Sequence, residues 1–419
     1  MTCKKAYKMN TVFTPAQRIS EVKEYYFSVK NKEIAAMNAR GENVINLGIG
    51  SPDLPPTKKV TDTLAAAAAR SDVHGYQSYI GIPELRGAFS DWYARKYGVS
   101  LDPACEILPL MGSKEGIMHI SMAFLNPGDG VLVPNPGYPT YSSVSRLVGA
   151  RLIPYELDEN NGWQPDFEKI EAAVDLAKVK LMWCNYPNMP TGAPASRELF
   201  ERLVAFGRKW NIIICHDNPY SFILNDHPMS ILEVEGAKDV CIELNSMSKT
   251  FNMPGWRIGM AASNRQFIEW ILRVKSNMDS GMFRPMQLAA VEALGQGDEE
   301  YAAMNEVYRR RRGLAKRILE AAGCRVDEAQ SGLFLWGRIE DPSIGSVAAG
   351  CGIGSNAADS DGTCASKLLS DRVLYGAKVF LTPGFIFGSV GRNYMRISLC
   401  CREEKLQEAL ERIQTLERK

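Results

Sequence analysis

Several features are absent from this sequence of 419 residues, and each absence narrows the choice of fold and function. The 49 basic side chains almost cancel the 48 acidic ones, so the net charge of +1 excludes a general nucleic-acid coat and a polybasic membrane anchor. No run of about 18 apolar residues occurs, and the N-terminal segment lacks the apolar core of a signal peptide. We therefore expect a soluble, cytoplasmic protein that binds neither nucleic acid nor a membrane.

Motifs of several common enzyme classes are also missing. There is no G-x-x-x-x-G-K-[ST], no H-E-x-x-H and no G-x-S-x-G, and Gly48-Ile49-Gly50 lacks the third glycine of a dinucleotide-binding loop. The four histidines lie far apart, and the ten cysteines include no C-x-x-C pair. We therefore expect no metal site and no disulfides, with the thiols buried in a reducing compartment.

The middle of the chain carries the clearest structural pattern. Between about residues 105 and 265, short apolar runs alternate with amphipathic ones, which is typical of a mostly parallel, doubly wound α/β sheet. Apolar side chains at helical spacing predict a crossover helix over residues 196–210. The predicted strands are 131–134, 179–184, 211–216, 240–244 and 257–263.

The pattern changes after about residue 300. A charged helix over residues 306–322, strands at 331–336 and 395–399, and a charged C-terminal helix predict a second, smaller α+β domain. The run Arg309–Arg312 is typical of a solvated helix face rather than of a nucleic-acid site. Residues 341–364 are rich in Gly, Ala and Ser and predict a loop.

Polar, aromatic or titratable residues follow four consecutive predicted strands, together with Pro or Gly. The four segments are 135–141, 185–192, 217–220 and 245–250. Ordinary loop composition explains any one of them alone. Because the carboxyl ends of parallel strands meet at one edge of a sheet, where such folds bind ligands, their coincidence predicts a binding site there.

Lys249 is the central residue of this predicted site. It follows an apolar strand and is flanked by Ser248 and Thr250, which places it at the sheet edge. Burial lowers the pKa of a lysine because it disfavours the ammonium form, and a neutral amine can form an imine with an aldehyde. Taken alone, a lysine in such a position is more often the partner of a phosphate or a carboxylate.

Two nearby segments suit a phosphate, and one buried acid suits a cationic ring. Arg257 opens the last predicted strand with a guanidinium that can bind phosphate through two nitrogens. The segment Gly112–Gly116 precedes an apolar helical run, so its backbone amides can face an anion. Asp217 closes an apolar strand and requires a cationic or proton-donating partner, such as a pyridinium ligand.

These residues resemble the class I/II aminotransferases, which are fold type I enzymes that use pyridoxal 5'-phosphate. The most specific match is Ser246-x-Ser-Lys249-Thr-Phe-x-x-x-Gly255-Trp-Arg257-Ile-Gly259, and the resemblance covers about residue 30 to the C-terminus. It implies a mostly parallel central sheet wrapped by helices, plus a smaller α+β domain. It also implies a homodimer with a shared active site. The expected division is a large cofactor domain at 51–295 and a small domain formed from 1–50 and 296–419.

The resemblance also implies an activity and the residues that hold the cofactor. The enzyme would move an amino group between an L-amino acid and a 2-oxo acid by a ping-pong mechanism, with glutamate and 2-oxoglutarate as one pair. Lys249 would form an imine with the cofactor and move a proton between the substrate Cα and the cofactor. The other expected cofactor contacts are Ser113, Lys114, Ser246 and Arg257 at the phosphate, Asp217 at the pyridine nitrogen, Tyr220 at the phenolic oxygen, and the stacking ring of Tyr138.

The remaining implied residues bind the substrate or join two subunits. Arg396 matches the arginine that binds the substrate α-carboxylate, with Gly50 and Asn185 as nearby candidates. Without the family, Arg396 could equally be a surface arginine. Tyr76 matches the tyrosine that reaches the cofactor phosphate of the neighbouring subunit.

The sequence departs from the family at one position. The family usually has Asn-Pro-x-Gly, whose asparagine donates to the phenolic oxygen, whereas this chain has Met189-Pro190-Thr191-Gly192. A thioether cannot donate this hydrogen bond. Either Asn188 reaches in from one position earlier and binds the cofactor, or Tyr220 holds the oxygen alone. We hypothesise that the lost donor raises the imine pKa and moves the activity optimum to higher pH.

Two other functions remain open from the residues. The same cofactor supports β-elimination from sulfur amino acids, and the fold also serves in non-catalytic regulators, although an arm of about 30 residues is too short for a DNA-binding domain. The substrate side chain is open as well. Arg284 could bind a distal acid, whereas Tyr25, Tyr26 and Phe27 allow an apolar pocket.

Overall fold

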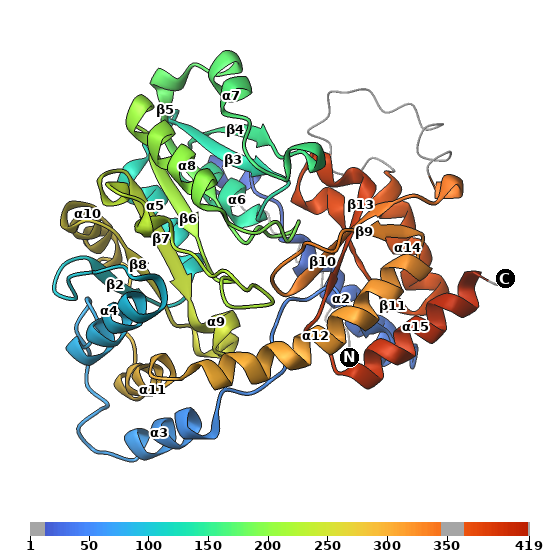
Figure 1. Ribbon diagram of the computed structural model, residues 1–419, viewed down its shortest axis with the longest axis horizontal. Coiled ribbons are helices and arrows are strands. Elements are labelled where there is room, and N and C mark those ends of the chain that lie inside the picture. Colours follow the sequence, from blue (N-terminus) through green and yellow to red (C-terminus); the bar gives the residue numbers. More distant parts are fainter. Residues whose placement is uncertain (1–12, 345–363, 418–419) are drawn as a thin grey trace.

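A seven-stranded sheet forms the centre of the larger part of the protein (Figure 1). The computed structural model describes residues 13–344 and 364–417. The strands, in the spatial order β2-β8-β7-β6-β5-β3-β4, are β2 (Ile107–Leu110), β8 (Gly259–Ala262), β7 (Cys241–Ser246), β6 (Ile213–Asp217), β5 (Val179–Cys184), β3 (Gly130–Asn135) and β4 (Arg151–Glu156). β8 pairs antiparallel with both of its neighbours, β2 and β7, and every other pair of neighbouring strands in this sheet is parallel. This arrangement confirms the mostly parallel sheet.

All five predicted strands are present, with ends that differ by no more than two residues. The sequence reading missed β2 and β4. β4 carries mostly exposed or half-buried residues and a proline, so it has neither a continuous apolar run nor an apolar alternation. β2 has four residues, which is too short for a periodic signal.

Helices cover both faces of this sheet, which is why its inner strands are apolar throughout. Along β5, Leu181 and Trp183 pack on one face with helices α5 (Ser113–Phe124), α6 (Pro139–Leu147) and α10 (Arg265–Lys275). Met182 and Cys184 point to the opposite face, into the core that includes the buried residues of α8 (Arg197–Trp210). The strands therefore end between two packed layers, and their carboxyl ends are held in fixed positions.

Helix α8 shows how local signals set an element's limits. The Ser196 hydroxyl accepts a hydrogen bond from the Leu199 amide at 3.1 Å and caps the helix start. Asn211, with φ 54°, adopts the left-handed conformation that ends it. Between them the apolar face lies against the sheet, and each fully buried large side chain contributes about 1.5–3 kcal/mol. The predicted helix over residues 196–210 is confirmed.

A four-stranded antiparallel sheet forms the smaller part, in the order β12-β13-β10-β9. Its strands are β9 (Cys324–Val326), β10 (Phe334–Ile339), β12 (Thr382–Pro383) and β13 (Tyr394–Ser398). Beside it, β1 (Ile45–Asn46) pairs in parallel with β11 (Val379–Phe380). In Figure 1 the blue N-terminal segment accordingly lies among the orange and red C-terminal elements. The two predicted strands of this part are present, shifted by up to three residues, and the proposed domain limits stay a prediction.

The remaining helices surround these two sheets. They are α1 (Gln17–Ser20), α2 (Tyr26–Ala39), α3 (Lys58–Ala68), α4 (Pro83–Tyr97), α7 (Phe167–Ala173), α9 (Met247–Thr250), α11 (Arg284–Leu294), α12 (Asp298–Ala321), α14 (Ala365–Ala377) and α15 (Glu403–Glu417). Most of the predicted loop at 341–364 falls outside the described residues. Within the described ranges, the eight cysteines are free thiols, and no helix is long and apolar enough to cross a membrane.

Candidate functional site

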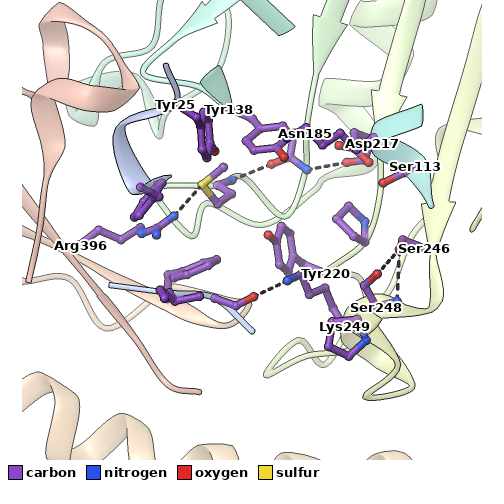
Figure 2. Close-up of a pocket in the computed structure, with 18 of the residues that line it drawn as sticks. Tyr25, Ser113, Tyr138, Asn185, Asp217, Tyr220, Ser246, Ser248, Lys249 and Arg396 are labelled. Atoms are coloured by element: carbon purple, nitrogen blue, oxygen red, sulfur yellow. Dashed lines mark hydrogen bonds between the residues drawn. The ribbon is translucent and has the colours of Figure 1, made fainter. Parts of the chain in front are cut away.

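A cavity of about 430 Å³ opens at the carboxyl ends of the central strands, and residues of the smaller sheet close its other side (Figure 2). Every residue that the sequence placed in the site lines this cavity except Asn188 and Tyr76. The predicted residues brought together are Gly50, Ser113, Lys114, Tyr138, Asn185, Asp217, Tyr220, Ser246, Lys249, Arg257 and Arg396.

One end of the cavity carries hydrogen-bond donors and a positive charge that can bind an anion. Gly112, at φ 86°, starts α5, and a Cβ there would lie 2.3 Å from Nη2 of Arg257. Glycine therefore lets the guanidinium approach the first amides of the helix at Ser113. The Ser246 hydroxyl donates to the Ser248 hydroxyl at 2.9 Å and accepts from its amide at 3.2 Å. Backbone amides, two hydroxyls and a guanidinium together fit a phosphate group.

Lys249 lies in α9, directly after β7, and its side chain enters the cavity. Its ammonium donates to the carbonyl oxygen of Gly50. Burial lowers the pKa of Lys249 below its ordinary value, and the charges of Arg396 and Arg257 lower it further. A larger fraction of the amine is therefore neutral than at the surface, as imine formation with an aldehyde requires.

Asp217 ends β6 and is 4% exposed. Its Oδ2 accepts a hydrogen bond from the Tyr141 hydroxyl at 2.9 Å, whereas its buried Oδ1 has no partner among the described residues. Burial raises the pKa of Asp217 to about 6, against the opposing effect of the Tyr141 hydrogen bond. A buried acceptor without a donor is costly, so the site fits a ligand that presents an N–H at Oδ1. A protonated pyridine nitrogen, as in pyridoxal phosphate, meets that requirement.

Asn188 does not reach the cavity. Its Oδ1 accepts from the Thr191 hydroxyl at 2.8 Å, and its Nδ2 donates to the carbonyl oxygen of Asn185 at 3.1 Å. The side chain is 3% exposed and stabilises the turn that leads to Met189. This geometry does not favour Asn188 as the replacement for the missing donor, because its Oδ1 and one of its amide N–H groups are engaged within the turn. The assignment of Asn188 to the cofactor therefore stays a prediction. Tyr220 lines the cavity and remains the candidate donor to the phenolic oxygen.

Arg396, on β13, lies at the end of the cavity away from Ser246 and Ser248 (Figure 2). Its guanidinium carbon is 3.9, 4.7 and 5.5 Å from three phenylalanine ring centres, those of Phe334, Phe387 and Phe27. Its Nη2 donates to the carbonyl oxygen of Gly48 at 2.7 Å. Burial lowers the pKa of Arg396 to about 10, so it stays charged at neutral pH. Its hydrogen-bond partners among the described residues are a thioether and a backbone carbonyl rather than a carboxylate, which leaves it available to an anionic substrate group.

Several cavity residues were not assigned to the site from the sequence, Tyr141 and Phe334 among them, and the predicted residue Tyr76 lies elsewhere. Tyr141 and Phe334 line the cavity, and Tyr141 could have been suspected because it follows Tyr138 by three positions on a helix. Tyr76 is 94% exposed and lies in a separate shallow depression beside residues 280–283. Within one chain it contacts nothing in the cavity, and its assigned role requires a second subunit.

The sequence profile described as "Aminotransferase class I and II" matches residues 42–413. An LL-diaminopimelate aminotransferase of Oleidesulfovibrio alaskensis is 41% identical over 411 residues, which cover 97% of this chain and all of that protein. One of Nitratidesulfovibrio vulgaris is 41% identical over 96% of this chain and 99% of that protein. Among solved structures, substrate-bound BacF from Bacillus subtilis has a TM-score of 0.86 and is 36% identical, with 97% of this chain and 98% of that chain covered.

Proposed function

This chain belongs to the class I and II aminotransferase family, and within that family we propose that it takes LL-diaminopimelate as its amino donor. It is a fold type I, pyridoxal-phosphate-dependent enzyme that moves an amino group between an amino acid and a 2-oxo acid. We propose 2-oxoglutarate as the acceptor. The names of the most similar relatives support the donor, and the charges in the cavity support both substrates.

The cofactor supplies an electron-withdrawing ring, and the residues around it have separate tasks. In this proposal Ser113, Ser246 and Arg257 hold its phosphate, and Lys249 binds its aldehyde carbon and moves a proton at the substrate Cα. Asp217 holds the pyridine N–H through Oδ1. The placement of these groups around one cavity supports this assignment of tasks.

The observation that carries the substrate proposal is the placement of Lys114, a cation in the cavity to which we assign no contact with the cofactor. The Lys114 ammonium lies 5.0 Å from the centre of the Tyr25 ring and has no hydrogen-bond acceptor among the described residues. Burial lowers the pKa of Lys114, and the charge of Arg257 lowers it further. Arg396 and Lys114 could therefore each bind one carboxylate of the same molecule. Both LL-diaminopimelate and 2-oxoglutarate carry a carboxylate at each end.

We propose that the active unit is a homodimer. Asp217 is the only acidic residue that lines the cavity in the described part of one chain, and it is committed to the pyridine nitrogen. The second ammonium of LL-diaminopimelate therefore needs a partner from another subunit. Tyr76, fully exposed in a single chain, supports such an exchange. The cytoplasmic location expected from the sequence stays a prediction.

A second substrate class is favoured by the aromatic wall of the cavity. Tyr25, Phe27 and Phe334 line it on the side of Arg396, and such rings suit an apolar or aromatic amino acid side chain. In that case Lys114 would act on the cofactor phosphate rather than on the substrate.

A half-reaction screen decides between these substrates. Holoenzyme is mixed with LL-diaminopimelate or one of the twenty common amino acids, and conversion of the cofactor to its pyridoxamine form is followed by absorbance. We expect fast conversion by LL-diaminopimelate and glutamate, and a loss of about 10- to 100-fold in kcat/KM for both in Lys114→Met. Conversion by aromatic amino acids alone, unaffected by Lys114→Met, would contradict the proposal. Steady release of ammonia and pyruvate from cystathionine would indicate a lyase.

A further inference from the structure

We propose that Tyr141 is a positioning residue for the cofactor: its hydroxyl holds one carboxylate oxygen of Asp217, so that the other oxygen is left for the pyridine nitrogen. The hydroxyl donates to Oδ2 at 2.9 Å, and Oδ1 is buried without a partner in the part of the chain that the structure describes. Figure 2 shows Asp217 at the edge of the cavity beside Asn185 and Ser113. The two oxygens therefore have different surroundings before any ligand binds.

Tyr141 is itself held rigidly. Its ring stacks on that of Trp183 with centres 5.0 Å apart and planes within 1° of parallel. The ring of Tyr138, which lines the cavity, meets it edge-on at 5.4 Å. The side chain is 1% exposed. Because packing fixes the ring on both sides, the hydroxyl cannot turn away from Asp217 without displacing a neighbour.

The hydrogen bond has a chemical consequence besides orientation. Burial raises the pKa of Tyr141 far above its ordinary value, so the hydroxyl stays protonated and can only donate to a carboxylate. Donation to the charged form favours ionisation of Asp217, which burial opposes. An ionised carboxylate stabilises the protonated pyridine ring that withdraws electrons from the substrate.

The other charges near Asp217 do not substitute for this contact. His216, on the same strand, and Lys249, on α9, favour the ionised form from a distance, whereas Glu243 on β7 opposes it. None of the three donates a hydrogen bond to the Asp217 carboxylate within the described ranges. Tyr141 is therefore the direct contact that controls the carboxylate.

Tyr141→Phe in the holoenzyme tests the proposal, with Tyr155→Phe as a matched control. Tyr155 is also a buried tyrosine, and its hydroxyl donates to the carbonyl oxygen of Trp183 at 2.7 Å, outside the cavity. We expect Tyr141→Phe to weaken pyridoxal phosphate binding roughly tenfold and to lower kcat by 10- to 100-fold, as for a hydrogen bond to a charged group. The acidic limb of the pH–rate profile should move up by about one unit, because Asp217 then ionises less readily.

Equal losses in both variants, with an unchanged pH profile and unchanged cofactor affinity in Tyr141→Phe, would overturn the proposal. Cofactor affinity in the Asp217→Asn background gives a second measurement. If Tyr141 acts through the Asp217 carboxylate, adding Tyr141→Phe there should change affinity less than twofold. A further tenfold loss of cofactor affinity in that background would overturn the proposal.

Discussion

The Nη1 of Arg396 donates to the sulfur of Met189 at 3.2 Å, and Met189 directly precedes Pro190-Thr191-Gly192. A thioether is a weak acceptor and no donor. Met189 can therefore help to place the guanidinium but cannot bind the phenolic oxygen of the cofactor. Because the side-chain hydrogen bonds of Asn188 lie within its own turn, we propose that Tyr220 holds that oxygen.

Met189→Asn should restore the missing donor. A hydrogen bond to the phenolic oxygen withdraws charge from it, so the imine between Lys249 and the cofactor should lose its proton at lower pH than in the natural enzyme. A pH titration of the cofactor absorbance measures this directly, and the activity optimum should move down with it. Met189→Leu, which keeps the bulk without a donor, should leave the titration where it is. An unchanged titration in Met189→Asn would contradict the hypothesis.

Arg396→Lys should reduce substrate binding while leaving cofactor binding intact. Lysine keeps the charge but cannot form the bidentate hydrogen bonds of a guanidinium to a carboxylate, and it loses the stacking on Phe334. We expect kcat/KM to fall by about 10- to 100-fold for every amino acid donor, since all share the α-carboxylate. Steady-state kinetics test this, with cofactor affinity as the control. A loss confined to dicarboxylic substrates would mean that Arg396 binds the distal group instead.

Gly112→Ala should weaken the hold on the cofactor phosphate. Alanine is strained at φ 86°, and its Cβ would lie 2.3 Å from Arg257 Nη2, so the guanidinium must move. We expect at least a tenfold loss of pyridoxal phosphate affinity, because the displaced guanidinium loses a charge-assisted contact. Gly313→Ala, in helix α12 with open space around its Cβ, is the control and should bind normally. Equal affinity of both variants for pyridoxal phosphate would show that Gly112 does not contribute to phosphate binding.

Tyr76 can be tested by mixing inactive subunits. If each site needs Lys249 from one subunit and Tyr76 from the other, a dimer of a Tyr76→Ala chain and a Lys249→Ala chain contains one complete site. Unfolding and refolding the two variants together should then restore up to about a quarter of the natural activity, as random pairing into twofold dimers predicts. Activity no greater than that of the separate variants would show that Tyr76 serves its own chain or no site at all.

The ion pair between Lys275 and Asp279 should be worth more to stability than a surface pair. Its side chains are 1% and 6% exposed, and the nitrogen and oxygen lie 2.7 Å apart. Lys275→Met leaves a buried carboxylate unpaired and should cost about 3–5 kcal/mol. Lys275→Met with Asp279→Leu should recover most of this. Denaturant unfolding at one fixed protein concentration measures both, and a loss below 1 kcal/mol would place the pair among ordinary surface pairs.

The same pair should make stability depend on acidity. Although burial acts to raise the pKa of Asp279, the Lys275 ammonium and the Gly281 amide hold it below its ordinary value in the folded state. This carboxylate therefore stabilises the fold at pH values above its unfolded pKa, and the contribution disappears as the pH falls through the folded pKa. Compared with the natural protein, Asp279→Asn should lose less stability between neutral and acidic pH. If the free energy of unfolding changed equally with pH in the two proteins, this prediction would be contradicted.

The strands and the motif around Lys249 could be predicted because their signals are local. Apolar runs of five or six residues mark strands that are buried on both faces, and the spacing from Ser246 to Gly259 follows from one strand end and one turn. The orientation of the Asn188 side chain could not be predicted, because it depends on hydrogen bonds inside a turn. The contact of Tyr141 with Asp217 joins residues 76 positions apart. Only the packing of α6 against the sheet brings them together.

The pairing of β1 with β11 fixes the order in which the protein can be completed during synthesis. Ile45 pairs with Val379, which is synthesised more than three hundred residues later. The hydrogen bond from Arg396 to the Gly48 carbonyl can form only after that. The central sheet, by contrast, has all its strands by residue 262. A nascent chain can thus contain the central sheet and Lys249 while it still lacks Arg396, the residue proposed to bind the substrate carboxylate. Chains released early would carry the proposed phosphate site without the arginine proposed to bind the amino acid.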